Sequence, residues 1–103
     1  MFSALYGTDA RLTILKQAAS PADPHTLALS ALGWIVVDET RAGRFLALTG
    51  LTADELRASL AYPATLAAVL DFLCSHEPDL IAAAEAIGSR PQDLVAARER
   101  LAA

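Results

Sequence analysis

The stretch ALTGLTADELRA, residues 47–58, holds the signals that decide the fold of this chain. Gly50 follows an apolar helical segment, and glycine is the residue that most often ends a helix in the left-handed conformation. Thr52 and Glu55 have the spacing of a capping box, in which each side chain accepts a hydrogen bond from the other residue's backbone N–H. The stretch therefore predicts one helix, a short turn and the start of a second helix.

A related joint occurs later in the chain. Placing Gly50 over Gly88 aligns LTGLTADEL with AIGSRPQDL. Leu56 then falls over Leu94, and an acidic residue precedes both leucines. Two copies are fewer than the roughly three that a repeat solenoid needs. The pattern instead predicts a pair of stacked helical hairpins.

The rest of the chain has the same helical character. Apolar residues recur at intervals of three and four, and the period-two alternation of strands is absent. A first helix is expected to begin at Ser20–Pro21 or Asp23–Pro24 and to run to about residue 38. Further helices are expected over about residues 40–49, 52–60, 63–76, 78–87 and 91–101. The fold class is all-α: a compact bundle of about six or seven short helices built from helical hairpins.

Residues 1–20 are expected to form either a seventh, N-terminal helix or a mobile arm. They precede a single helical domain, which we assign to residues 21–103. One domain is also what a chain of 103 residues predicts.

The segment 63–76 is strongly apolar with one narrow polar stripe, and is expected to be the central helix. Its one acidic residue, Asp71, should reach the solvent rim or pair with Arg41 or Arg44. In the first helix, Gly33 is expected to let a neighbouring backbone approach closely, and Trp34 is expected in the core. Other apolar residues expected to be buried are Leu29, Val36 and Ile81.

The charge of the chain argues against a nucleic-acid partner. Its net charge is −4, and its basic residues are one lysine and seven scattered arginines, whereas neutralising phosphates supplies most non-specific affinity. The segment after Gly50, ADELRASL, offers one arginine against two carboxylates, which suits base reading poorly. A DNA-associated regulator that uses the Gly50 joint is therefore the alternative hypothesis.

The sequence also predicts the compartment. No apolar stretch reaches the roughly 18 to 20 residues that a membrane span requires, and the N-terminus lacks the basic leader and cleavage site of a secretory signal. The single cysteine, Cys74, excludes an internal disulfide and fits a reducing compartment. We expect a cytoplasmic protein that has no membrane partner.

Residues that could perform chemistry are few. Cys74 and His76 lie two positions apart, on different sides of a helix, and His25 is the other histidine; a zinc site needs four ligands at suitable spacing. We expect a buried Cys74, and a His76 that contacts the last carbonyls of its helix. The pair Asp38–Glu39 is attributed to solvation. We predict no catalytic residue, metal, cofactor or small-molecule ligand, and an orphan enzyme is the third hypothesis.

The apolar fraction of 54% exceeds the usual range of about 45–50%. This excess predicts an exposed apolar patch that serves self-association or a protein partner. Arg41, Arg44 and Arg57 lie near the Gly50 joint, and Tyr62 precedes Pro63; tyrosine and arginine are common interface anchors. These three arginines and Tyr62 are the candidate partner surface. The leading hypothesis is a small, non-enzymatic helical module for protein–protein interaction.

The motifs ALGW, RFLALTGL, AAVLDFL and LIAAAEAIG occur in this order within about residues 25–101. In them the chain resembles a family of small bacterial proteins, domain-of-unknown-function family 3572. The resemblance implies an all-helical cytoplasmic protein and brings no catalytic residues. It also implies a partner in signalling or cell-cycle control, and hence a regulatory or signalling adaptor.

Overall fold

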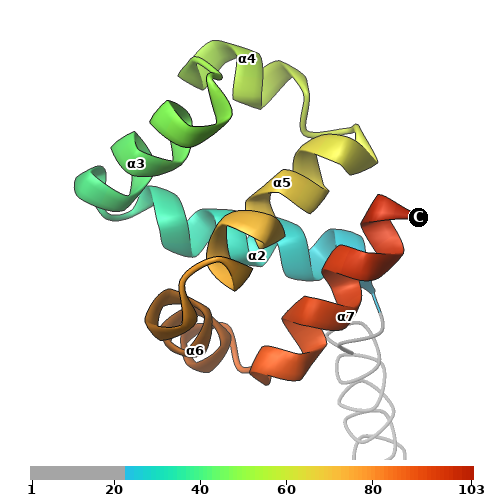
Figure 1. Cartoon of the computed structure of the whole chain (residues 1–103). Helices are drawn as coiled ribbons and strands as arrows, with labels where there is room; N and C mark the ends of the chain where they lie inside the picture. Colours follow the sequence, from blue (N-terminus) through green and yellow to red (C-terminus); the bar gives the residue numbers. More distant parts are fainter. Residues whose placement is uncertain (1–22) are drawn as a thin grey trace, which may run out of the picture.

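The computed structural model describes residues 23–103, which fold into six α-helices without a strand (Figure 1). The all-α prediction is confirmed. The helices are α2 (Pro24–Val36), α3 (Glu39–Thr49), α4 (Ala53–Ala58), α5 (Pro63–Cys74), α6 (Glu77–Ala86) and α7 (Pro91–Ala102). The N-terminal helix or arm expected over residues 1–20 lies outside the described residues. None of the helices in residues 23–103 combines the length and the apolar character needed to cross a membrane.

Helix starts follow the capping residues. The carboxylate of Asp23 accepts hydrogen bonds from the N–H groups of His25 and Thr26, at 3.1 and 3.4 Å, so the Asp23–Pro24 start is the one used. Asp38 caps α3 and accepts from the N–H of Arg41 at 3.1 Å. The attribution of Asp38 to solvation was therefore wrong, because α2 ends two residues before it and a new helix begins there.

Both glycine joints form as predicted. Gly50 and Gly88 each have a φ of 75°, the left-handed conformation that most side chains avoid. At the first joint Thr52 and Glu55 complete the capping box, with hydrogen bonds of 2.9 and 3.0 Å. At the second joint only the acidic half is present: the carboxylate of Asp93 accepts from the Arg90 N–H at 3.0 Å.

The core is built around α5, which packs against α2, α3, α6 and α7 (Figure 1). The central position of α5 is therefore confirmed. Its apolar stripe is fully covered, and α2 and α7 also contact each other beside it. The buried α5 side chains are Leu66, Val69, Leu70, Phe72 and Leu73.

The helices α3 and α4 form an arch over one side of this core (Figure 1). Phe45 anchors the arch, because it is fully buried and its ring meets that of Phe72 edge to face, with centroids 5.3 Å apart. Further along the arch, α4 has six residues and buries only Leu56. The arch is thus anchored to the core through α3, whereas most of the surface of α4 is exposed.

Several burial predictions were wrong. Leu29 and Val36 are exposed, because α2 buries one stripe against its neighbours and no described residue covers the opposite face. Ile81 is exposed as well, and Ala83 of α6 is buried instead. A Cβ atom on Gly33 would meet nothing within 4 Å, so no backbone approaches it within the described chain. Trp34 is half-buried at the edge of the core rather than inside it.

Asp71 is exposed at the solvent rim, which is one of the two predicted outcomes. Its ion-pair partner, however, is Arg98 of α7, at 3.3 Å, rather than Arg41 or Arg44. The reason is the packing of α7 beside α5, which places Arg98 nearest to that stripe.

Candidate functional site

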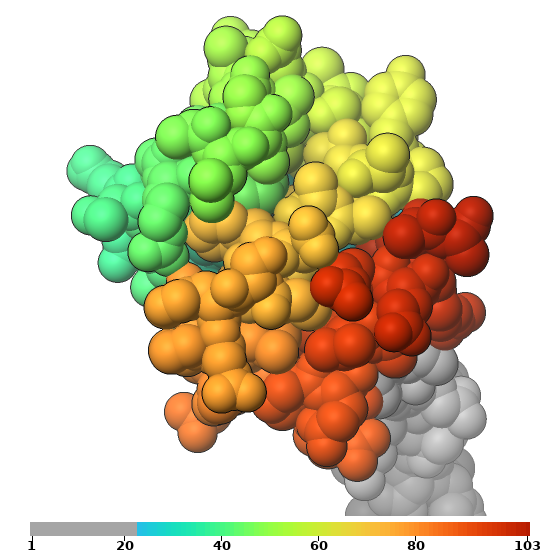
Figure 2. All heavy atoms as spheres, in the orientation of Figure 1, coloured from blue at the N-terminus to red at the C-terminus, as the bar shows by residue number. Residues whose placement is uncertain are grey.

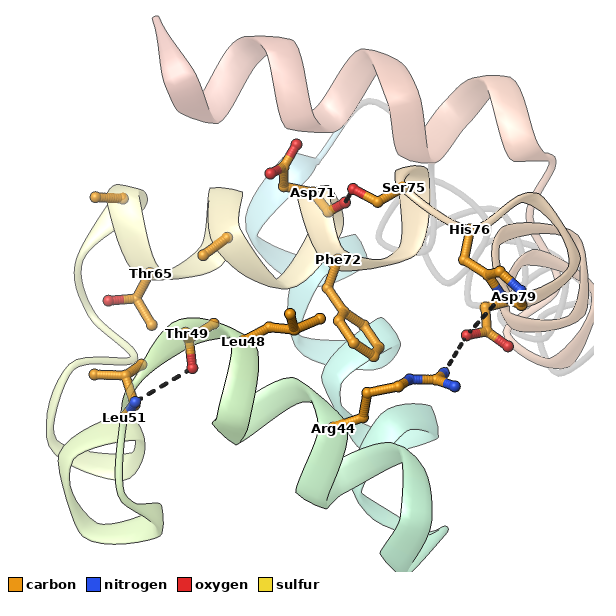
Figure 3. A pocket seen from close by; sticks show the side chains of 12 residues that line it. Arg44, Leu48, Thr49, Leu51, Thr65, Asp71, Phe72, Ser75, His76 and Asp79 are labelled. Atoms are coloured by element: carbon orange, nitrogen blue, oxygen red, sulfur yellow. Dashed lines mark hydrogen bonds and ion pairs between the residues drawn. The ribbon is translucent and has the colours of Figure 1, made fainter.

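A surface groove of about 730 Å³ lies between α3 and α5, and we call it the α3–α5 groove (Figures 2 and 3). One wall comes from the arch, and the other comes from α5 and the start of α6. The wall on the arch consists of Arg44, Leu48, Thr49 and Leu51. The opposite wall consists of Ala64, Thr65, Ala68, Asp71, Phe72, Ser75, His76 and Asp79.

The middle of the groove is apolar. Leu48 is 72% exposed, and its side chain extends from α3 toward Phe72 (Figure 3). Ala64 and Ala68 lie one helical turn apart on α5 and line the facing wall, where larger side chains would fill the space. Phe72 is held in place by its edge-to-face contact with Phe45. The result is a hollow with a firm aromatic floor and an uncovered leucine on its wall.

One end of the groove is charged. The carboxylate Oδ2 of Asp79 lies 2.6 Å from Nη2 of Arg44 and 3.1 Å from Nδ1 of His76 (Figure 3). The Arg44 guanidinium also lies 5.4 Å from the centroid of the Phe72 ring. Arg44 therefore joins the arch to α6 across the end of the groove. These groups give the groove a polar end that can orient a bound partner.

Two of the three hydroxyl groups that line the groove, those of Ser75 and Thr49, are engaged within their own helices. Ser75 Oγ donates to the backbone carbonyl of Asp71 at 2.8 Å, and Thr49 Oγ1 donates to that of Phe45 at 3.0 Å. Neither bond pairs a hydroxyl with a general base. The groove as built offers shape, apolar surface and charge, which are the means of binding.

Cys74 and His76 do not form a reactive pair in this arrangement. Cys74 is half-buried rather than buried as predicted, and burial raises the pKa of its thiol, which disfavours the reactive thiolate. The prediction that His76 contacts the last carbonyls of its helix was wrong. His76 is instead the N-cap residue of α6, and its ring contacts Asp79. Within residues 23–103 no group of three or more histidine, cysteine, aspartate or glutamate side chains could hold a metal ion.

The four residues of the candidate partner surface lie in separate surroundings. The guanidinium of Arg41 lies 3.6 Å from the Trp34 ring centroid, and its Nη2 donates to the Trp34 carbonyl. Arg44 lines the α3–α5 groove, as described above. Arg57 of α4 pairs with Asp54 at 2.9 Å. Tyr62 is exposed just before α5. Proximity along the chain did not bring these residues together, because α3 and α4 present them to different neighbours.

Sequence reasoning missed Leu48, Phe72 and Asp79 as groove residues. Leu48 did carry a signal, because it is a large apolar residue that falls outside the inward-facing stripe of Phe45 and Leu46. Phe72 and Asp79 carried none. Phe72 shares the groove with Leu48, and Asp79 pairs with Arg44, only because α5 packs against α3 and brings the start of α6 to its end.

A second groove, of about 520 Å³, lies between α2 and α4, and we call it the α2–α4 groove. Its walls are almost entirely apolar, and among residues 23–103 Arg57 is the one charged residue that lines it. The α2 wall consists of Leu29, Leu32, Gly33 and Val36. The arch supplies Ala42, Phe45, Leu46, Ala53, Leu56, Arg57 and Leu60. The arch therefore borders both grooves.

The comparisons with known proteins place the chain. The family model described as "Protein of unknown function (DUF3572)" matches residues 21–103. The chain belongs to the DUF3572 family. The match spans every described helix and both grooves, and it confirms the resemblance found in the sequence motifs. No curated protein and no solved structure matches the chain. DUF3572 membership brings no activity with it, so the case for a function rests on the two grooves.

Proposed function

We propose that this DUF3572 protein is a non-enzymatic protein-interaction module that binds a helical segment of another protein in the α3–α5 groove. The observation that carries the proposal is Leu48, which is 72% exposed beside an apolar hollow of about 730 Å³. Fully burying a leucine side chain is worth about 1.5–3 kcal/mol. A partner that covers Leu48 would gain this stabilisation.

The form of the groove supports a helical partner. Amphipathic helices bind in apolar grooves through anchor residues at intervals of three and four. The small side chains of Ala64 and Ala68 leave room for such anchors along α5. At the charged end, Arg44, His76 and Asp79 offer donors and acceptors that would fix the direction of the partner helix. Specificity would come from this end and affinity from the apolar middle.

The alternative of a DNA-associated regulator has less support. The helix after the Gly50 joint, α4, has six residues, and its first turn contains Asp54 and Glu55. Its one basic side chain, Arg57, is paired with Asp54. A helix that reads DNA needs unpaired donors directed to base edges. We therefore propose a cytoplasmic adaptor in regulation or signalling in preference to a DNA-associated regulator.

The test compares Leu48→Asp with Ile81→Asp, an equally drastic change at an exposed apolar residue of α6 that does not line the groove. Proteins that the full chain captures from its bacterial host would be identified, and their affinities measured by titration calorimetry. We expect the wild type and Ile81→Asp to bind one protein alike and Leu48→Asp to bind it at least tenfold more weakly. Circular dichroism would check that both variants fold.

Two results would overturn the proposal. One is binding by Leu48→Asp as tight as that of the wild type. The other is a wild-type chain that captures no protein whose binding depends on this groove.

A further inference from the structure

The exposed face of α2 contains a glycine that the described chain does not explain. Gly33 lies in the interior of the helix Pro24–Val36, where only proline is less favourable than glycine. It does not have the positive φ of Gly50 and Gly88, and a Cβ atom on it would meet nothing within 4 Å. Neither the backbone conformation nor packing within the described residues requires a glycine here.

Apolar side chains surround this glycine on the surface. Leu29, Val36 and Val37 are 44%, 48% and 78% exposed, and they are three of the six large apolar residues that are exposed in residues 23–103. Leu29, Gly33 and Val36 follow one another at intervals of four and three, which places them on one face of α2. The face is therefore an apolar stripe with a gap at Gly33, where no side chain projects from the helix.

We infer that this stripe is a self-association surface, occupied by the α2 helix of a second copy of the chain. In this arrangement the two α2 helices cross at Gly33, and each lies in the α2–α4 groove of the other copy. A two-fold interface must be complementary to itself. The stripe meets this requirement, because Leu29 and Val37 both lie four positions from Gly33, so that Leu29 of one copy would meet the valines of the other.

Charge favours a second copy at this face over other faces. The chain has a net charge of −4, so two copies repel each other, and the repulsion is strongest where like charges face each other across the contact. The α3–α5 groove would bring Asp71 and Asp79 of both copies together. The α2–α4 groove has Arg57 as its one charged residue, and Asp54 already neutralises it at 2.9 Å.

The role of the glycine follows from this packing. Helix axes in a packed pair lie about 8–10 Å apart, depending on the side chains at the crossing point. Glycine at the crossing brings the two backbones close and lets Leu29 and Val36 reach the opposite groove. A Cβ atom at position 33 would meet nothing within 4 Å among the described residues. We therefore expect a larger residue there to leave the fold of one copy intact and to hold two copies apart.

The experiment is sedimentation equilibrium of the full chain across micromolar concentrations, with Gly33→Leu and a matched control, Gly43→Leu. Gly43 of α3 is also exposed, and a Cβ atom on it would also meet nothing within 4 Å. We expect the wild type and Gly43→Leu to form a species of twice the 10.8 kDa chain mass. Gly33→Leu should raise the dissociation constant at least tenfold, and Val36→Asp should do the same.

A wild type that stays at 10.8 kDa throughout would overturn the inference. So would a Gly33→Leu or Val36→Asp variant that associates as tightly as the control. Leu48→Asp should leave the dimer intact, so this result is independent of the outcome for the α3–α5 groove.

Discussion

The two glycine joints share their local chemistry and differ in how extensively the following helix packs against the core. Gly50 and Gly88 have the same φ of 75°, and each is followed by an acidic residue that accepts from the N-cap N–H of the next helix. After Gly88, however, α7 (Pro91–Ala102) packs against α2, α5 and α6. After Gly50, α4 (Ala53–Ala58) buries one residue. The signals that place a joint in the sequence therefore do not set how firmly the following helix is held.

This difference bears on function, because both candidate grooves border the less firmly held arch rather than the α6–α7 joint. Elements with few buried contacts open and adapt more easily than the core. Groove walls formed by the arch can adjust to a partner while α2, α5 and α7 hold the fold.

The largest difference is expected between the equivalent leucines. Leu94 of α7 is fully enclosed, whereas Leu56 of α4 is buried but borders the α2–α4 groove. Leu94→Ala should lower the free energy of unfolding by about 4 kcal/mol and Leu56→Ala by about 2 kcal/mol, since the cost rises with the cavity that remains. Urea denaturation followed by circular dichroism measures both. Equal losses of unfolding free energy would contradict the inference that α7 is packed more firmly than α4.

The glycines themselves should behave alike. Both have the left-handed conformation, and a Cβ atom on either would meet nothing within 4 Å, so the cost of a side chain comes from the backbone alone. Gly50→Ala and Gly88→Ala should each destabilise the chain by about 1–2 kcal/mol. Gly43→Ala, in a helix with negative φ, is the control and should stabilise it by up to about 1 kcal/mol. A neutral or stabilising change at Gly50 or Gly88 would show that the joint does not need glycine.

The smallest effect concerns pH at the second joint. The Arg90 side chain and backbone N–H both donate to Asp93 and lower the pKa of its carboxyl. A lowered pKa in the folded state gives stability above the ordinary aspartate pKa of about 3.9, and this stability is lost as the pH falls through the lower folded value. Asp93→Asn should therefore weaken the acid dependence of unfolding below about pH 4.

Arg90→Ala provides the matched measurement. Carboxyl NMR titration should find that the pKa of Asp93 rises when the guanidinium is removed and the backbone donor remains. An unchanged pKa would mean that the guanidinium, which contacts Asp93 at 3.2 Å, contributes nothing to the joint in solution.

The sequence by itself determined the helix boundaries at Gly50, Thr52, Pro63 and Gly88, because caps and turns depend on residues within one helical turn of each other. For the first helix it left two starts open, Ser20–Pro21 and Asp23–Pro24, and the structure shows the second. For Asp71 it left open the solvent rim or a pair with Arg41 or Arg44, because one helix determines which residues share a stripe but not which residues face that stripe. The sequence of one helix does not determine which of its stripes a neighbouring helix covers. Leu29, Val36 and Ile81 are apolar at helical spacing and were predicted to be buried, but the helices that could cover them pack elsewhere.

Only the tertiary structure decided the partners across helices. The pairing of Asp71 with Arg98 joins residues far apart in the chain, and so does the groove that both Leu48 and Phe72 line. The pairing of Arg44 with Asp79 does the same. Their contacts depend on the angles at which α3, α6 and α7 pack against α5, and no local pattern records those angles. Local hydrogen bonds fixed where each helix begins and ends, and the competition of all helices for one small core fixed which of their faces became grooves.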